Sequence, residues 1–274
     1  MKRIFALMLA LLMACSLVAC SDKEEEEEEG EFDMTVTNNE LVYRPENSND
    51  DAFYYEYIND DEVSIIAYTG SHVPHAIALP ATIDNRPVTN IAAGAFNSKA
   101  NITAVTIPDS VVAIGDYAFN NCAMLSAIVL PAGLVSLGDA VFANCVALTS
   151  VNPVTIEDES VNTLPDGVEE IGSALFYNCE KLENMMLPET ITVLPKQTFM
   201  GCVALTAVAW SEAGTAIADY AFMGCTALQY VMMPTTLTAV GNYAFAGCVA
   251  LQYAPLPAGT TLGENAFYGC DALS

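Results

Sequence analysis

The sequence predicts a β-dominated α/β fold: a right-handed solenoid of about eight repeats of ~23 residues, closed at its start by a β-hairpin. The first observation is the recurrence of Phe at positions 96, 119, 142, 176, 199, 222, 245 and 267. The gaps are 23, 23, 34, 23, 23, 23 and 22 residues. A fixed period of this size is typical of one small unit stacked on copies of itself. The second observation is that Cys and Leu follow each Phe at constant spacing in almost every copy.

The composition is apolar and strongly acidic. Apolar residues make up 53% of the 274 residues, and 34 acidic residues against 8 basic ones give a formal charge of −26. From Val88 onward the only basic residues are Lys99, Lys181 and Lys196. Binding to nucleic acid or to anionic lipid headgroups needs clustered Lys and Arg. We therefore expect neither as a partner.

Residues 1–19 read as a secretory signal. Lys2 and Arg3 precede an almost wholly apolar or small stretch, residues 4–19, which is the pattern of an export signal. A transmembrane anchor is the alternative, but the apolar run is short for a span of about 20 residues.

The end of this segment, Leu17-Val18-Ala19-Cys20, resembles the lipobox of bacterial lipoproteins. That resemblance implies acylation of Cys20, which becomes the mature N-terminus. Cys15 is a second candidate, and an ordinary signal with an unmodified Cys is the alternative reading.

Six consecutive Glu residues, 24–29, follow the signal. Like charges repel one another and keep a chain solvated, so residues 20–50 are predicted to be an acidic, disordered tether. The Glu run also resembles the export signal of Bacteroides-group surface lipoproteins, which implies an outer-membrane lipoprotein facing the cell exterior. A plain solvated spacer, on a periplasmic protein, is the alternative.

Residues 51–87 are predicted to cap the solenoid. Segments 53–58 and 63–68 are rich in strand-forming residues and flank the turn 59–62. Segments 77–80 and 87–91 read as partial repeat strands. Because a solenoid end exposes an apolar cross-section and free strand edges, something must cover it. The hairpin is the obvious candidate.

The repeats occupy residues 88–274. The spacing L-x-x-L-x-L, as in Leu125, Ile128 and Leu130, is that of a leucine-rich repeat strand. Pro closes most copies of this strand and a second short apolar segment follows. Residues 116–121 are predicted to form a tight turn or a single helical turn that places Phe119 in the interior.

The pattern I-G-x-x-A-F-x-x-C-x-x-L-x-x-I-x-L-P, seen in residues 114–131, resembles the BspA-type leucine-rich repeats of bacterial surface proteins. The resemblance covers residues 88–274. It implies a solenoid and an association with adhesion to host or matrix proteins, and it offers no motif for binding residues. Two departures stand out: an insertion of about eleven residues within 152–163, and a last unit that stops at Leu273-Ser274 without its strand.

Seven of the nine cysteines recur three residues after a Phe. Stacked at the strand spacing of ~4.8 Å, their Cβ atoms lie further apart than a disulfide prefers. We therefore expect buried free thiols acting as small apolar fillers. Disulfides, or a metal or redox role, are the alternatives.

No motif for catalysis is present, so we expect neither an enzyme nor a cofactor or metal site. The sequence lacks a phosphate-binding loop and the common hydrolase and zinc motifs. His72 and His75 are the only histidines and have no third ligand at a sensible spacing. The acidic turn 60–62 lacks the ligand spacing of an EF-hand.

A binding surface is easier to identify. The x positions of the repeat strands face outward, which places Met186, Tyr230, Met232 and Tyr253 on one face. Tyr and Met are enriched in recognition surfaces, although scattered exposed apolar residues are also normal. Trp210 falls in an inward column and is predicted to belong to the core.

The leading hypothesis is a non-catalytic binding or adhesion module for an extracellular or host protein, attached to the membrane only through its lipid. A structural role in the cell envelope through the open C-terminal end, and a glycan-binding accessory protein, are the alternatives.

Overall fold

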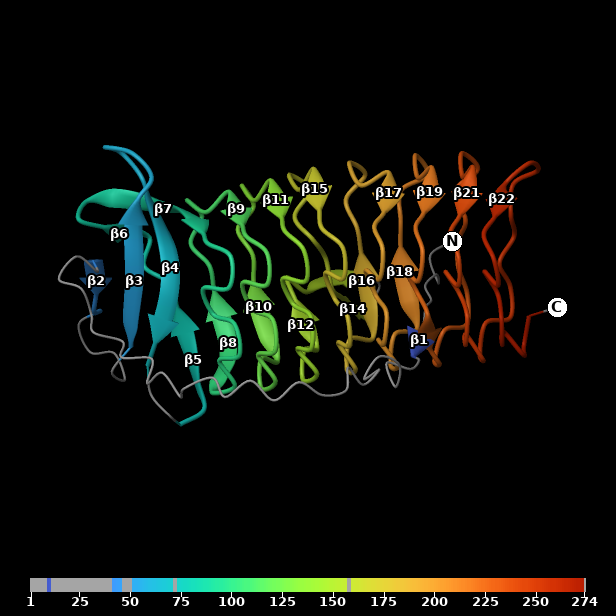
Figure 1. Cartoon of the computed structure of the whole chain (residues 1–274), viewed down its shortest axis with the longest axis horizontal. Coiled ribbons are helices and arrows are strands. Elements are labelled where there is room, and N and C mark those ends of the chain that lie inside the picture. Colours follow the sequence, from blue (N-terminus) through green and yellow to red (C-terminus); the bar gives the residue numbers. More distant parts are fainter. Residues whose placement is uncertain (1–8, 11–40, 46–50, 71–72, 157–158, 274) are drawn as a thin grey trace, which may run out of the picture.

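The computed structural model describes residues 9–10, 41–45, 51–70, 73–156 and 159–273. They form one elongated stack of turns that runs from the cap at β2–β4 to the last turn at β22 (Figure 1). The predicted solenoid is confirmed. No helix occurs in these residues, so the stack is built from short strands and turns alone.

One side of the stack is a parallel sheet made by the L-x-x-L-x-L segments. Its first part has the order β12-β10-β8-β5, and β16 pairs with β18 further along. The strands are β5 (His75–Ala78), β8 (Ile102–Thr106), β10 (Ala127–Val129), β12 (Ser150–Val151), β16 (Asn184–Met186) and β18 (Ala207–Ala209).

A second sheet is made by the short apolar segments that follow. It has the order β15-β11-β9-β7-β4-β3-β2, with β6 pairing β7, and β17-β19-β21-β22 form a further four-stranded sheet. The strands are β2 (Leu41–Tyr43), β3 (Ala52–Tyr57), β4 (Val63–Thr69), β6 (Thr82–Ile83), β7 (Arg86–Ile91), β9 (Ala113–Ile114), β11 (Ser136–Leu137), β15 (Glu170–Ile171), β17 (Val193–Leu194), β19 (Ala216–Ile217), β21 (Ala239–Val240) and β22 (Thr261–Leu262). In addition, β1 (Leu9–Ala10) pairs antiparallel with β20 (Gly224–Cys225).

The predicted hairpin cap is present as the antiparallel pair β3 and β4, and β4 continues in parallel into β7. The cap begins earlier than residue 51, because β2 pairs antiparallel with β3 within the segment predicted to be tether. Tyr43 of β2 packs against the core. β2 thus covers the edge that β3 would otherwise leave open.

The Phe residues form a continuous stack along the interior. Phe119 and Phe142 have ring centroids 5.9 Å apart, and Phe199 and Phe222 are 5.6 Å apart with planes only 2° from parallel. Tyr68 of the cap stacks on Phe96, 5.3 Å away, and so begins the column. The aromatic column therefore runs unbroken from the cap to the last repeat.

The segment around each Phe is a turn, which settles the choice between a turn and a helical turn. Tyr117 and Asn121 have φ values of 57° and 58°, and left-handed residues on both sides of Phe119 prevent a helix. Alternate amides in the turn bond to the next repeat, as in Phe119 N–H to the Val141 carbonyl at 2.9 Å. The turns thus form a third ladder along the stack.

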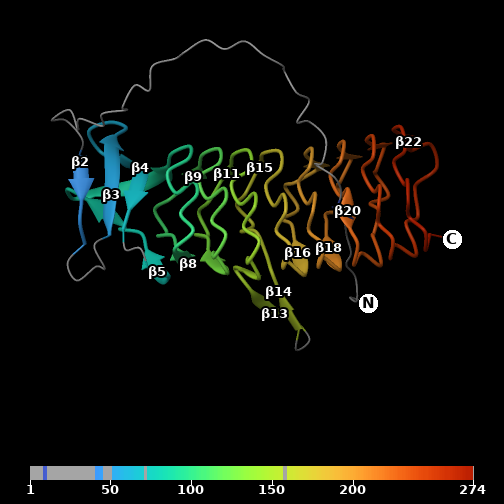
Figure 2. The same cartoon turned by 60° about the horizontal axis from the view of Figure 1, so that its bottom comes forward.

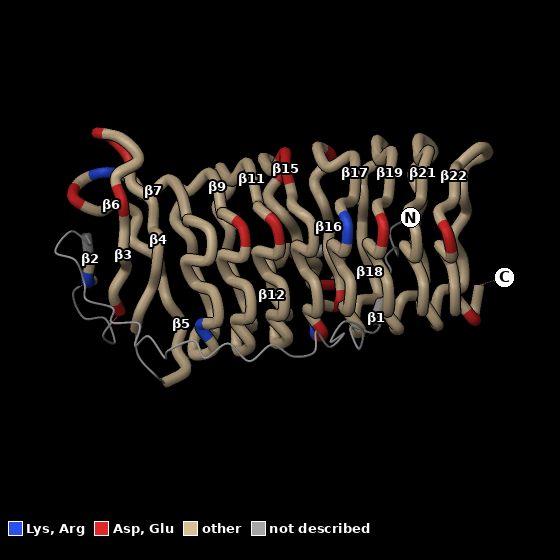
Figure 3. Tube along the Cα trace, viewed as in Figure 1, with Lys and Arg blue, Asp and Glu red and all other residues tan. Residues whose placement is uncertain are grey.

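Close contact between repeats explains the glycine that precedes many of these turns. A Cβ on Gly172 would lie 2.4 Å from the Asp139 nitrogen, a distance no side chain tolerates. Next to this column, Asp139 accepts the Ser173 N–H at 2.6 Å, and Lys196 pairs with Asp219 at 2.9 Å. These charged residues lie in a row along the stack in Figure 3. The hydrogen bond from Lys196 lowers the pKa of Asp219 below its usual range.

The seven Cys residues of the repeats are free thiols, as predicted, and all but Cys270 are buried. Their role goes beyond filling space: Cys145 Sγ donates to the Phe119 carbonyl at 3.2 Å, and Cys179 Sγ donates to the Phe142 carbonyl at 3.2 Å. A thiol at this position is small and apolar, and still supplies a weak donor to a buried carbonyl.

Replacing a central ring should destabilise the stack more than replacing the last one. Phe176 is fully buried, whereas Phe267 is only partly buried. We expect Phe176→Ala to cost about 3–5 kcal/mol of unfolding free energy and Phe267→Ala clearly less, measured by urea denaturation monitored by circular dichroism. Equal losses in the two variants would contradict a core built on this column.

The thiols should differ in reactivity. Burial raises the pKa of Cys122 to about 12 and that of Cys179 well above its ordinary value, whereas a hydrogen bond from Cys248 lowers the pKa of the half-exposed Cys270. Because the thiolate is the reactive form, Cys270 should react with an aromatic disulfide reagent at least about tenfold faster at pH 7. Timed labelling and peptide mass spectrometry measure this, with Cys270→Ser as the control. Uniform labelling of all seven would show that the column is open to solvent.

Candidate binding surface

Several predictions concern residues outside the described part of the chain. The lipid-bearing Cys20, most of the signal 1–19 and the Glu run 24–29 lie there. They stay predictions. Among the described residues no helix is long and apolar enough to cross a membrane.

The four residues predicted to share a face alternate with buried residues, as expected. Tyr230, Met232 and Tyr253 are 44%, 49% and 59% exposed, while Val231 and Met233 between them point inward. Tyr230 and Tyr253 form a parallel bridge between adjacent repeats. These two rings and Met232 therefore make one exposed apolar patch.

Met186 belongs to the same outward row but stands apart from the other three. It ends β16 and pairs in register with Ala209 of β18, and it is half-buried. Ala207 and Ala209 occupy the repeat between it and Met232. The small side chains of β18 therefore leave a trough between Met186 and the Tyr230–Met232–Tyr253 patch.

The insertion within 152–163 is a projecting β-hairpin. β13 (Val154–Ile156) pairs antiparallel with β14 (Glu159–Val161), and Figure 2 shows the pair extending away from the stack beside β16. Phe142 and Phe176, on either side of the insertion, still stack at 5.6 Å. The hairpin therefore leaves the core in register.

A buried amide fixes the root of this hairpin. Asn162 is 5% exposed, its Oδ1 accepts the Val151 N–H at 2.8 Å, and its Nδ2 donates to the carbonyls of Thr149 and Asn184. Its own N–H donates to Asn184 Oδ1 at 2.7 Å. The Asn162 side chain thus replaces part of the backbone ladder that the insertion interrupts between β12 and β16.

Two further contacts tie the hairpin down. Asn184 Nδ2 donates to the Ser160 carbonyl at 3.1 Å, and Thr163 Oγ1 donates to the Asn152 carbonyl at 2.9 Å. Sequence analysis found the insertion but not this anchoring. The only available signal was the presence of Asn at 152, 162 and 184, which is common in loops of any kind.

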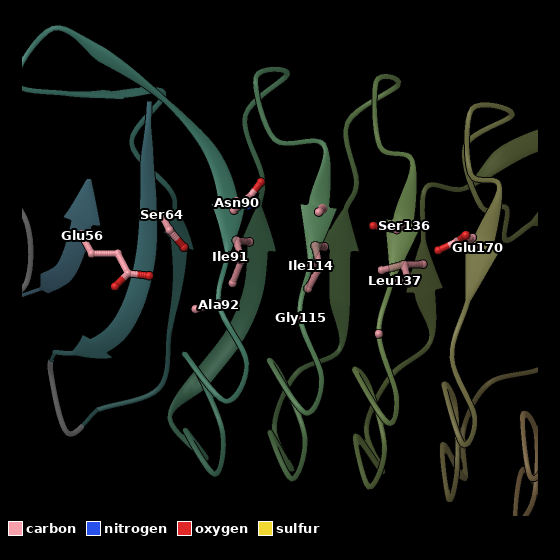
Figure 4. Close-up of a pocket in the computed structure, with 12 residues that line it drawn as sticks. Glu56, Ser64, Asn90, Ile91, Ala92, Ile114, Gly115, Ser136, Leu137 and Glu170 are labelled. Carbon is pink, nitrogen blue, oxygen red and sulfur yellow. The ribbon is translucent and has the colours of Figure 1, made fainter. Parts of the chain in front are cut away.

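Two depressions lie on the surface. One, of about 500 Å³, adjoins the hairpin root and is lined by Leu164, Met186 and Leu187 with Asp166 and Glu189 at its border. The other, of about 440 Å³, lies on the second sheet. Figure 4 shows its floor of small residues between Glu56 and Glu170. Sequence analysis missed both, because each is created by what small side chains leave empty.

Trp210 is only partly buried, although it packs against the core as predicted. Its Nε1 donates to the Ile191 carbonyl at 2.7 Å. A Cβ on Gly214 would lie 2.6 Å from the indole, which explains why this repeat departs from the usual Pro-containing pattern.

The histidine pair is not a metal site in the part of the chain that the structure describes. His72 lies outside it, and no group of three or more His, Cys, Asp or Glu within it is placed to hold a metal ion. His75 Nε2 lies 3.0 Å from Asp51 Oδ1, which also accepts the Tyr68 hydroxyl at 2.6 Å. Burial and this carboxylate raise the pKa of Tyr68 well above its usual value. The cluster closes the cap beneath the aromatic column.

The profile of the BspA type leucine rich repeat region matches residues 89–160 and 159–274, with six copies. The chain belongs to this family. No curated protein matches it.

Solved structures of bacterial repeat proteins are similar to the chain. A leucine rich cell surface protein from Faecalibacterium prausnitzii is 29% identical over 77% of this chain and 53% of that one, with a TM-score of 0.63. A leucine-rich repeat protein from Bacteroides ovatus is 28% identical over 81% and 62%, with a TM-score of 0.62. The T. pallidum leucine-rich repeat protein is 27% identical over 81% and 88%, with a TM-score of 0.58. The chain thus spans about half the length of the first relative, and no enzyme family is indicated.

Removing the root amide should loosen the hairpin. Asn162→Ala leaves the Val151 N–H and two buried carbonyls without this partner, at about 1–3 kcal/mol for each group left unsatisfied. We expect a Glu-specific protease to cut after Glu159 at least about tenfold faster, since cleavage follows the population of the open form. Asn120→Ala, which removes a half-exposed amide on the turns, is the matched control. Unchanged cleavage in the Asn162 variant would mean that the anchor is not needed.

Proposed function

We propose that this protein is a lipid-anchored surface protein whose solenoid binds an extracellular or host protein without catalysing a reaction. Membership of the BspA-type family and similarity to a cell surface protein support a binding or adhesion module. The lipobox-like Leu17–Cys20 and the Glu run after it support anchoring through Cys20 and display on the outer membrane.

The observation that favours the sheet face as the binding surface is the exposed Tyr230–Met232–Tyr253 patch. Tyr residues of this kind supply large contact areas with little loss of side-chain freedom. The patch sits on strands fixed by the ladder and the Phe column, so little ordering is needed on binding.

Ligand capture should depend on the two exposed tyrosines. With the full chain displayed on intact cells, we expect wild type to capture at least one protein from an array of extracellular matrix proteins and glycans. Tyr230→Ala with Tyr253→Ala should weaken that capture about 10- to 100-fold, since aromatic anchors at an interface contribute about 1–3 kcal/mol.

The matched control is Tyr117→Ala with Tyr268→Ala, because these side chains are 51% and 70% exposed elsewhere on the stack. It should bind as wild type does. Protease treatment of the intact cells should remove capture. Capture of glycans alone, or equal loss in the control, would refute a protein-binding face at Tyr230 and Tyr253, and protease resistance would refute surface display.

A further inference from the structure

The hairpin β13–β14 and the sheet face together form a corner. The hairpin rises beside β16, where Asn184 bonds to the Ser160 carbonyl. Its root is held by the buried Asn162, so it is a fixed wall rather than a free loop. On the other side of β18 stand Tyr230 and Met232.

The space between wall and patch fits one extended chain. Met186 and Met232 lie two repeats apart, which is about 10 Å at the usual strand spacing. Their side chains occupy part of this width, and only Ala207 and Ala209 lie between them. A helix with its side chains is about 10–12 Å across and does not fit, whereas an extended segment does.

Charge determines what kind of segment the corner accepts. Residues 154–190 hold nine acidic side chains and one basic one, Lys181, while residues 191–274 hold four acidic ones and Lys196. Glu159 on the hairpin and Glu183 at the start of β16 are both exposed. The ion pairs found in the described residues are His75–Asp51 and Lys196–Asp219. Glu159 and Glu183 therefore face solvent without a cation from this part of the chain.

We propose that this corner binds an extended segment of the partner protein that carries Lys or Arg between apolar residues. Alternate side chains of such a segment point to opposite sides. One set fills the trough over Ala207 and Ala209, and the other reaches Glu159 and Glu183. Tyr230 and Tyr253 offer ring faces to the same cations. This proposal rests on the binding face proposed above and adds the wall and the chemistry of the occupant.

The test uses three fluorescent nonapeptides with identical apolar residues and with Lys/Arg, Gln or Glu at the alternating positions. Fluorescence anisotropy measures their binding to the full chain. The basic peptide should bind at least about tenfold more tightly than the Gln peptide, and its affinity should fall as salt rises, because exposed charges are screened.

Charge reversal locates the effect. Glu159→Lys with Glu183→Lys should weaken binding of the basic peptide about tenfold. The matched control, Glu264→Lys with Asp271→Lys, makes the same change of net charge at exposed positions of the last repeat and should stay within about twofold of wild type. Equal weakening in the two variants would show attraction to net charge alone and overturn the site.

The two proposals fail separately. If the double Tyr variant loses protein capture but wild type does not prefer the basic peptide, the face stands and the basic occupant is wrong. If wild type prefers the basic peptide and only the Glu159/Glu183 variant weakens it, the corner is supported whatever the array shows. Preference for the Gln or Glu peptide overturns it.

Discussion

The whole structure depends on repeats stacking in register, because no single repeat can bury its own apolar face. Each turn of about 23 residues contributes one Phe ring to a continuous column, and neighbouring rings such as Phe199 and Phe222 lie nearly parallel at 5.6 Å. Backbone ladders on three sides hold the same register. Aromatic stacking and hydrogen bonding thus demand the same alignment, which explains why the period tolerates no small shifts within a repeat.

The column also explains which sequence variations the fold accepts. Two residues before and two after each Phe, the backbone is left-handed, and Asn and Gly share the second of these positions, as at Asn178 and Gly201. A Cβ on Gly201 would lie 1.9 Å from Asn178 Oδ1. Once the chain changes from Asn to Gly at this position, the Asn side chain of the preceding repeat takes up the space, so the change is compatible with stacking in one direction.

Much of the fold could be predicted from the sequence, because the features that specify it repeat. Phe119 and Cys122 announce their environment eight and seven times over, and the cap hairpin has a strong strand composition. The alternation at Tyr230 and Met232 also follows from period two. Features that occur once could not be predicted: the role of Asn162 depends on three backbone groups that the sequence does not place together. The strand β2 was missed because a polar, acidic surrounding obscures Leu41 and Tyr43.

The binding surface combines both kinds of feature. Its floor belongs to the repeating sheet, which gives rigidity and a regular spacing, and its wall belongs to a single insertion, which gives identity. Repeats of this type differ from one another chiefly at outward positions, so a change such as Ala209 in one repeat and Met232 in the next alters the surface without disturbing the core.

The substitution of one asparagine side chain for missing backbone has a wider meaning. Asn162 lets the chain leave the stack and return with its hydrogen bonds intact, so the length of what lies outside becomes independent of the architecture inside. Such a junction is an evolutionary socket: loops of other lengths and chemistries could be exchanged there, and new recognition could arise without any revision of the scaffold.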